Sequence, residues 1–418
     1  MRFRSGIGRR LMAVSVAVTL LALAGCSTDG SAAIDLPAQT DAPLTGDISG
    51  RIDDAVDRAM SLAAAPGAIV GVWAPWSGFQ LKGYGEAEIG GEAMSPDMHF
   101  RAASTTKAMT CTVLLGLVDE GRVALHDLAS EFVSVVGIEG ITLGQLCQST
   151  SGLGNFRSTF QSQFVSNPTR RWVPEELVSD GVARSSDAAP GSAYTDDDTA
   201  YVLLGMALQR IGGEPLGDLF EKYVFDPIGM RESSLPAAAT TTLPEPAAHG
   251  YQVVGDDCAA PKDLSELSPS MLGTSGGAVT TADDLKRFAQ AFATGSMFSD
   301  ETAKTQWTTV PLGGDAPTWQ GYGYGAFQIG PLRGQVGNIP GFSTAAFSDP
   351  ATGLTVVVML NSSSARGKLV RALALELASY AAAAPAADGQ TRPEPTLPWS
   401  PEQMQAESTS AAVCQEGR

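Results

Sequence analysis

The feature that most constrains the fold is a short polar stretch, Phe100 to Lys107, which runs directly into an apolar helix predicted from Ala108 to Glu120. The apolar residues of this segment fall on nearly every face of a helix, so the helix has to be buried on all sides. The chain must therefore build its core around it. A lysine in the first turn is buried with it, and a buried ammonium group has to be paired or functional.

Ser104 and Lys107 stand three residues apart at the start of this helix, a spacing that places both side chains on one face. Lys107 could then accept the proton of the Ser104 hydroxyl, while the free N–H groups of the helix start stabilise an oxyanion. We interpret Ser104 as a nucleophile and Lys107 as its base. The alternative is that Ser104 only caps the helix and Lys107 is solvated, because Ser-x-x-Lys recurs by chance in long chains.

Composition limits the class of function. The 418 residues are 44% hydrophobic and 17% charged, an ordinary globular balance that allows a sizeable core. The formal net charge of −18 would repel nucleic acids and anionic membrane surfaces. We therefore exclude DNA and RNA as partners.

The N-terminus predicts export. Arginines come first, an apolar run from Leu11 to Ala24 follows, and Leu23-Ala24-Gly25-Cys26 resembles a lipobox. Residues 1–25 are interpreted as a lipoprotein signal peptide, with Cys26 lipidated and anchoring the protein to the outer face of the bacterial cell membrane. The alternative is an ordinary secretory peptide with a chance cysteine. Removal of residues 1–25 takes away four Arg and no acid, which changes the formal net charge to −22.

Four further cysteines allow three disulfide pairings in an oxidising compartment. Cys111 and Cys147 lie in apolar helical stretches and could equally be small core residues. Cys258 and Cys414 lie in polar segments, where a disulfide could fasten the C-terminal segment. We predict a Cys258–Cys414 disulfide.

The order of elements predicts one domain from residue 49 to 382, between a flexible tether at 26–48 and a surface tail at 383–418. Two hairpin-like strands at 68–73 and 79–84 are followed by a helical lobe of about 101–270. Strands between 322 and 360 and a helix at 366–381 close the fold. This order indicates an α/β (α+β) fold in which a mixed antiparallel sheet, with its N- and C-terminal segments side by side, is flanked by helices and an inserted helical lobe.

Several motifs in one order resemble the serine β-lactamase-like family, which includes class C β-lactamases, DD-peptidases and related esterases. The resemblance covers roughly residues 51–380 and rests on four motifs. These are Phe100–Lys107, Ser149-Thr150-Ser151-Gly152-Leu153, Pro190-Gly191 leading to Tyr201-Val202-Leu203-Leu204-Gly205, and Gly276–Leu285. The resemblance implies a β-lactamase/transpeptidase-like fold, no cofactor, and an acyl-enzyme at Ser104.

The second motif of that family, Tyr-x-Asn, departs from the family pattern here. An ungapped alignment places Asp196 at the Tyr position and Asp198 at the Asn position. A two-residue slip would give Tyr194 the Tyr role instead, but it needs a compensating insertion before Tyr201, so we prefer Asp196. A carboxylate beside Lys107 would keep the amine protonated, although that carboxylate could itself accept the serine proton.

The third motif has lost its cation. In the family a Lys or His precedes a small residue and a Gly, and the matching residues here are Gln335, Val336 and Gly337. The resemblance implies that the Asn338 N–H, together with the Ser104 N–H, forms the oxyanion hole. Arg333 shares a strand face with Gln335 and could restore a positive charge, or could be a solvated edge residue. The missing cation predicts weak reaction with carboxylate-bearing substrates such as penicillins.

A rival motif, Gly273-Thr274-Ser275-Gly276-Gly277, fits the nucleophile elbow of α/β-hydrolases, but that fold needs a later His. His99, His126 and His249 all precede Ser275. They share no ligand spacing with Cys, so we predict no metal site. Ser275 is therefore interpreted as a loop residue without a catalytic role.

The sequence thus favours an exported, lipid-anchored serine hydrolase acting on an ester, an amide or a peptidoglycan-type peptide, and expected to be a monomer. The alternative is a penicillin-binding-like lipoprotein that keeps the pocket as a binding module but has lost efficient chemistry, as Asp196 and Gln335 suggest.

Overall fold

The structure, a computed structural model, describes residues 38–186, 188–255, 257–394 and 396–413. The predicted signal peptide, Cys26, the first part of the predicted tether and Cys414 lie outside the described residues. The centre of the fold is an eight-stranded antiparallel sheet of order β2-β1-β12-β11-β10-β9-β8-β7. Its strands are β1 Gly67–Ala74, β2 Gly78–Gly85, β7 Val310–Pro311, β8 Gln320–Tyr322, β9 Phe327–Ile329, β10 Leu332–Ile339, β11 Phe342–Ser348 and β12 Thr355–Leu360.

The first and last long strands of the domain lie side by side inside this sheet, next to its edge strand β2. Strand β1 pairs with β12, so that Ala68 lies opposite Leu360 and Val70 opposite Val358. Every residue of both strands is buried, because helices cover both faces of the sheet at this point. Their runs of apolar and β-branched residues suit such a doubly covered position. The predicted adjacency of the N- and C-terminal segments is confirmed.

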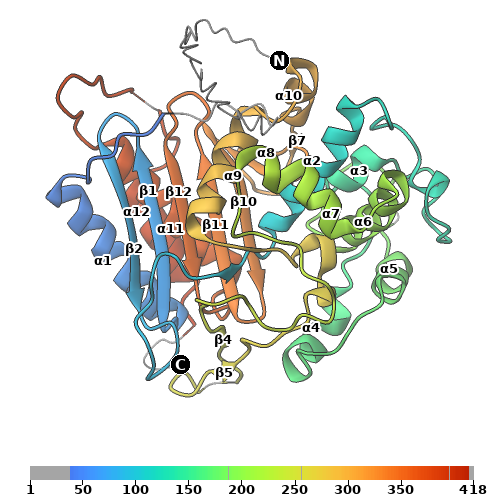
Figure 1. Ribbon diagram of the computed structural model, residues 1–418, viewed down its shortest axis with the longest axis horizontal. Helices are drawn as coiled ribbons and strands as arrows, with labels where there is room; N and C mark the ends of the chain where they lie inside the picture. The colour runs from blue at the N-terminus through green and yellow to red at the C-terminus, as the bar shows by residue number, and fades with distance from the viewer. Residues whose placement is uncertain (1–37, 187, 256, 395, 414–418) are drawn as a thin grey trace, which may run out of the picture. The chain divides into compact units, whose positions relative to one another are not determined.

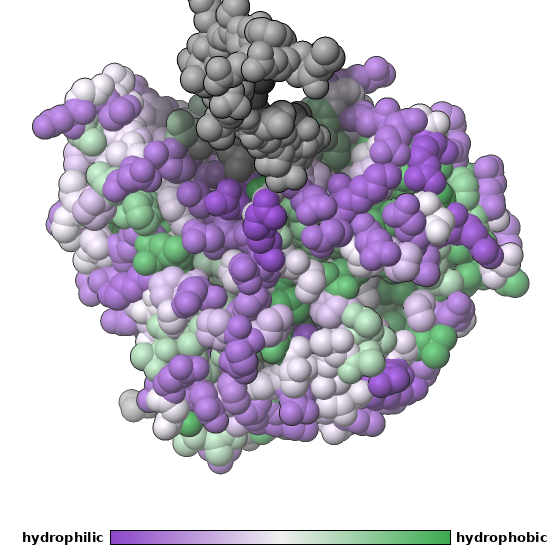
Figure 2. Space-filling model, viewed as in Figure 1, coloured by the Kyte–Doolittle hydropathy of each residue, from purple (hydrophilic) through white to green (hydrophobic). Residues whose placement is uncertain are grey.

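Helices form a layer on each face (Figure 1). Helices α1 Gly46–Ala63, α11 Arg366–Ala382 and α12 Pro401–Ser410 share one apolar cluster with one face of the sheet. Helices α2 Thr105–Asp119 and α9 Ala282–Thr294 belong to the cluster on the other face, which extends into the helical lobe. On the surface shown in Figure 2 hydrophilic residues predominate, and hydrophobic ones form small separate patches.

The helical lobe surrounds α2. Twelve of the fifteen residues of α2 are buried, as its apolar pattern predicts. The lobe consists of α3 Leu143–Cys147, α4 Arg157–Ser166, α5 Pro174–Ala183, α6 Thr199–Gly212, α7 Leu216–Phe220, a π-helical turn at Glu221–Phe225 and α8 Asp226–Ile228. A disulfide between Cys111 and Cys147 joins α2 to α3. The sequence allows either a disulfide or separate core packing for these two cysteines, and the structure has the disulfide. Cys258 is disulfide-bonded as well, but its predicted partner Cys414 is not a described residue, so that pairing stays a prediction.

The domain is longer at both ends than its sequence predicted. Helix α1 begins at Gly46, inside the predicted tether, and Leu44 before it is already buried. The segment predicted as a surface tail contains α12, whose start is fixed by a capping box between Ser400 and Gln403. Trp399 and Met404 anchor this helix in the core. Because a polar segment with so few apolar residues shows almost no hydrophobic periodicity, the helix could not be predicted from the sequence.

The remaining strands are short. They are β3 Phe100–Arg101, which pairs with β6 Val279–Thr280, and β4 Tyr251–Gln252, which pairs with β5 Lys262–Asp263. Within the region 322–360, where strands are predicted, residues 322–329 do not form one continuous strand, because Gly325 takes a positive φ of 91° and turns the chain between β8 and β9. No helix among the described residues is long and apolar enough to cross a bilayer.

Candidate active site

Ser104 lies between β3 and α2, at the position that caps the helix. The chain turns sharply before it, since Ala103 has a φ of +50°, a left-handed conformation that a residue with a Cβ rarely adopts. The turn is held by hydrogen bonds, including one that the Thr106 hydroxyl donates to the Ala103 carbonyl over 2.7 Å. The Ser104 side chain makes no capping hydrogen bond to the helix. Its hydroxyl is therefore free to face the cleft, which disfavours the interpretation of Ser104 as a simple cap.

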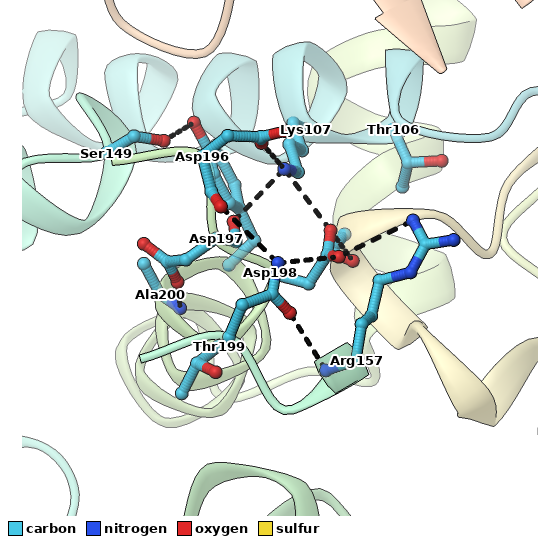
Figure 3. A network of polar contacts seen from close by, with 12 residues as sticks. Thr106, Lys107, Ser149, Arg157, Asp196, Asp197, Asp198, Thr199 and Ala200 are labelled. Carbon is cyan, nitrogen blue, oxygen red and sulfur yellow. Dashed lines mark hydrogen bonds and ion pairs between the residues drawn. The ribbon is translucent and has the colours of Figure 1, made fainter. Parts of the chain in front are cut away.

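Lys107 is buried beside it, with 4% of its side chain exposed. Its Nζ donates to Asp196 Oδ1 at 2.9 Å and to the Asp197 carbonyl at 3.0 Å, and lies 3.2 Å from Asp198 Oδ1 (Figure 3). Burial alone would lower the pKa of Lys107, but the carboxylates of Asp196 and Asp198 outweigh it and raise that pKa above its usual value. The two carboxylates therefore favour the protonated form of Lys107, and its role as base stays a prediction.

Two carboxylates take the positions that the ungapped alignment assigns to the second motif. Asp196 keeps 73% of its side chain exposed and lines the cleft, whereas Asp198 is 3% exposed. The ring of Tyr194 instead stacks near that of Tyr322, with centroids 4.8 Å apart, and does not line the cleft. The structure therefore brings Asp196 and Asp198 to Lys107 and leaves Tyr194 to one side.

Asp198 is held by groups from three directions. Its Oδ2 lies 3.7 Å from Arg157 Nη1 (Figure 3). Its Oδ1 accepts from the Ser275 hydroxyl at 2.9 Å, and its Oδ2 also accepts from Asn155 Nδ2 at 3.5 Å. Burial would raise the pKa of Asp198, but Lys107 and Arg157, helped by these hydrogen bonds, lower it overall. Asp198 is thus an internal counter-ion to Lys107 rather than a group offered to substrate.

Asp197 has a different role from its two neighbours. Its Oδ1 accepts the backbone N–H of Ala200 at 2.6 Å and so caps the start of α6. Burial raises the pKa of Asp197 to about 8. The acidic triplet is therefore divided between one exposed carboxylate, one helix cap and one buried counter-ion.

The end of β10 forms the wall opposite Ser104. A Cβ on Gly337 would lie 2.3 Å from the Ser104 nitrogen, so only glycine lets the strand approach this closely. Strand β9 pairs with β10 only as far as Gly334, and the Asn338 carbonyl instead accepts from Arg157 Nη1 at 2.9 Å. The N–H and C=O of one residue in an antiparallel strand point to the same side. The Asn338 N–H therefore points away from β11, toward the side on which Ser104 lies, as an oxyanion hole requires.

Gln335 does not replace the lost cation. Its amide Nε2 donates to the Tyr322 hydroxyl at 3.0 Å and to the Gly325 carbonyl at 2.8 Å, while its Oε1 accepts from the Val336 N–H. Arg333 does not replace it either, and that alternative is wrong. Arg333 donates to the Ala293 carbonyl in the last turn of α9, stacks on Trp307, and is not part of the cleft lining.

Positive charge enters the cleft from elsewhere. The cleft, of about 860 Å³, contains Ser104 and is lined on its other walls by cationic side chains from α4 and α11. These are Arg157, Arg366, Lys368 and Arg371. Arg371 is paired with Glu407, whereas Arg366 is exposed at the first residue of α11. The cleft therefore carries less negative charge than the sequence suggests from the carboxylate of Asp196 and the missing cation at Gln335.

Sequence reasoning missed several residues of this site, because they come from segments remote from the motifs. Tyr322 on β8 lies between Gln335 and Tyr201, and its hydroxyl is 2.8 Å from that of Tyr201. It also missed the hydrogen bond that the Ser275 hydroxyl donates to Asp198, while the absence of a catalytic role for Ser275 stays a prediction. Only the position of Ser275, directly before the Gly276–Leu285 motif, could have pointed to it. Within the described part of the chain no group of three or more His, Cys, Asp or Glu side chains is arranged to hold a metal ion.

Several known proteins are similar to this chain in sequence. The family model described as Beta-lactamase matches residues 52–379. The chain is 30% identical over 230 residues to the D-alanyl-D-alanine-carboxypeptidase/endopeptidase AmpH of Escherichia coli strain K12 (52% of this chain, 55% of that protein). It is 24% identical over 260 residues to penicillin-binding protein 4* of Bacillus subtilis strain 168 (59% and 56%). The chain thus spans little more than half the length of these curated relatives.

Solved structures show the same fold. A D-stereospecific amidohydrolase from Streptomyces sp. superposes with a TM-score of 0.66 at 27% identity, over 74% of this chain and 94% of that one. The D-amino acid amidase of Ochrobactrum anthropi SV3 superposes with a TM-score of 0.66 at 24% identity, over 76% and 92%. The predicted fold class, an antiparallel sheet flanked by helices, is confirmed.

Proposed function

Because the chain belongs to the beta-lactamase family of serine hydrolases, we propose that it forms an acyl-enzyme at Ser104 and releases the acyl group to water. The observation that carries the proposal is the arrangement around Ser104. The Ser104 hydroxyl makes no capping bond and lies at the N-terminus of α2, beside the buried ammonium group of Lys107. Gly337 allows strand β10 to approach it closely.

Asp196 is the proton acceptor in this proposal, because it is the exposed carboxylate of the cleft and Lys107 is held as a cation. As Ser104 Oγ forms its bond to the substrate carbonyl carbon, its proton passes to Asp196, and the oxyanion is stabilised by the Ser104 and Asn338 N–H groups and by Lys107. Asp196 then returns the proton to the leaving group. A water molecule repeats the sequence on the acyl-enzyme, and Ser104 regains its proton from Asp196.

The alternative is a binding module without turnover, favoured by the raised pKa of Lys107 between two carboxylates and by a Gln335 amide that donates to Tyr322 and Gly325. Exposure of the purified protein to a fluorophosphonate and to a fluorescent penicillin, followed by mass measurement over time, separates the two. A serine hydrolase gains the adduct mass at Ser104 and turns over an activated ester. A binding module shows neither.

The substrate class follows from the relatives only as a proposal. Two of the similar proteins are a D-alanyl-D-alanine-carboxypeptidase/endopeptidase and a D-amino acid amidase. We take an ester, an amide or a peptidoglycan-type peptide as the substrate of this chain, and the monomeric state stays a prediction.

Substrate charge can be predicted from the cleft. Arg366 is exposed at the cleft wall, so an anionic group on the substrate is attracted rather than repelled, and this reverses the expectation from the missing cation at Gln335. We expect a substrate with a free carboxylate to have a higher kcat/KM than its methyl ester. Arg366→Ala should reduce this preference by roughly two- to fivefold, the scale of an exposed charge pair.

The measurement is kcat/KM for the matched pair at low and high salt. Arg231→Ala removes an exposed arginine outside the cleft and serves as the control. A preference for the ester in the unmodified protein would contradict this assignment of charge.

Export and lipid anchoring are proposed from the N-terminal sequence, and the buried Cys111–Cys147 disulfide suits an oxidising compartment. Cys26→Ala should move the protein from the membrane fraction to the soluble fraction of the cell envelope, because the lipid on Cys26 is its anchor. Immunoblotting of the two fractions checks this. Unchanged fractionation of the variant would exclude Cys26 as the anchor.

A further inference from the structure

Ser275 is buried at the end of a short 3₁₀ turn, Gly273–Ser275, and belongs to none of the family motifs that surround Ser104. Its hydroxyl donates to Asp198 Oδ1 at 2.9 Å. The acceptor is the same oxygen that lies 3.2 Å from Lys107 Nζ. Ser275 and Lys107 therefore both contact the same oxygen of the buried Asp198 carboxylate.

The backbone around Ser275 is tied to both helices that carry the site. Thr110 on α2 donates its hydroxyl to the Thr274 carbonyl at 2.6 Å, and the Thr274 hydroxyl donates to the Tyr201 carbonyl on α6 at 2.7 Å. The Ala278 N–H donates to the Thr106 hydroxyl at 3.1 Å. The backbone of Ser275 is thus held in place by both helices, and its hydroxyl reaches Asp198 from a fixed segment.

Asp198 has cations on both sides, Lys107 near Oδ1 and Arg157 near Oδ2. A carboxylate placed in this way can turn toward either partner, so a fixed hydrogen bond to one oxygen decides its orientation. We propose that Ser275 is a positioning residue that holds Asp198 against Lys107 and thereby sets how the ammonium group is shared between Asp198 and Asp196.

The kinetic consequence rests on the proposed function. When Asp198 turns toward Arg157, Lys107 is left with Asp196 as its main carboxylate partner, and a more tightly paired Asp196 is a weaker acceptor of the Ser104 proton. Loss of the Ser275 hydroxyl should therefore slow acylation without disturbing the walls that bind substrate. We expect Ser275→Ala to lower kcat about tenfold, the scale of a hydrogen bond to a charged group, with little change in KM.

The pH profile should change as well. The hydrogen bond from Ser275 is one of the influences that lower the pKa of Asp198, after the opposing effect of burial and the attraction of the two cations. Charged and titratable groups facing Asp198 are Lys107, Arg157, Asp196, Asp197 and Tyr194. In Ser275→Ala these groups are unchanged, so the pKa of Asp198 rises, and the acid limb of the pH profile of the unfolding free energy moves to higher pH.

A double-mutant cycle with Asp198→Asn tests the proposal in the full chain, with two readouts. The first is kcat for an activated ester, and the second is the free energy of unfolding by denaturant as a function of pH. If Ser275 acts through Asp198, Ser275→Ala has a smaller effect on both in the Asp198→Asn background. The destabilisation by Ser275→Ala should also diminish as the pH falls and Asp198 is protonated, since a lowered pKa contributes stability only above it.

Ser348→Ala is the matched control, because it removes an equally buried serine hydroxyl on β11 whose partner is Thr355. It should destabilise the fold without moving the pH profile. Additive effects in the cycle, or an acid limb that does not move, would overturn the positioning role. If the unmodified protein forms no adduct at all, the proposed function fails, and the unfolding cycle still decides the role of Ser275.

Discussion

Ser104→Ala should abolish the covalent adduct with a fluorophosphonate and lower kcat/KM for an activated ester by about three or more powers of ten. The loss is large because the oxygen that forms the acyl-enzyme bond is removed, while binding and the oxyanion donors remain. The folded state should be almost unaffected, since the Ser104 side chain makes no capping bond to α2. Mass spectrometry, ester kinetics and thermal unfolding of the same sample give the three results together.

The matched control for this variant is Ser158→Ala. Ser158 also lines the cleft, but its hydroxyl donates to the Asn155 carbonyl, so its removal should leave adduct formation and turnover nearly unchanged. An adduct that persists in Ser104→Ala, or that disappears equally in Ser158→Ala, would place the nucleophile elsewhere in the cleft.

Lys107→Met should cost roughly 3–5 kcal/mol of unfolding free energy near neutral pH, because it leaves the buried carboxylate of Asp198 without its nearer cation. Met keeps the length of the side chain, so the loss is one of charge rather than of packing. Hydrolysis should fall by several powers of ten, since the oxyanion loses its ammonium group and Asp198 is free to turn toward Arg157.

The effect should depend on pH in a defined direction. In the unmodified protein the pKa of Asp198 is lowered, so its contribution to stability is present at neutral pH and is lost as the pH falls through that pKa. The raised pKa of Lys107 gives a contribution that is lost only in strongly alkaline solution, as the pH rises through it. The destabilisation of Lys107→Met is therefore largest near neutral pH and shrinks in acid, where Asp198 takes up a proton.

Denaturant unfolding at several pH values measures this effect. Lys222→Met is the control, because Lys222 lies at the surface in a half-exposed pair with Glu120 and should change the unfolding free energy by no more than about 0.5 kcal/mol. A stable, active Lys107→Met protein would show that the buried ammonium group is dispensable.

The parts of the fold that the sequence predicts well are those with a strong local signal. Helix α2 is apolar on all faces, and Thr142 and Gln145 form the capping box of α3. Local patterns do not show where a polar helix with few anchors begins, so α12, held by Trp399 and Met404, was predicted as a tail.

The site divides in the same way. Ser104 and Lys107 are close in sequence. Asp196 and Asp198 could be located without a structure, because the family motifs before and after them fix the alignment. Ser275 and Arg157 approach Asp198 from segments far away along the chain, and no periodicity encodes such an approach. Arg333 is the opposite case. The sequence predicts that it shares a strand face with Gln335, but not that its guanidinium group donates to the Ala293 carbonyl at the end of α9 and so stays out of the cleft.

The pairing of β1 with β12 also determines the order in which the chain can be completed. The inner edge of β1 cannot be paired until β12 has been synthesised, because β12, with Leu360 opposite Ala68, is the neighbour of β1 on that side. Until then β1 and β2 form an isolated hairpin, which is marginally stable in water, with one long apolar edge open. A nascent or truncated chain that stops before β12 therefore exposes the edge of the apolar strand β1 as a template for aggregation, and needs protection from other chains until synthesis ends.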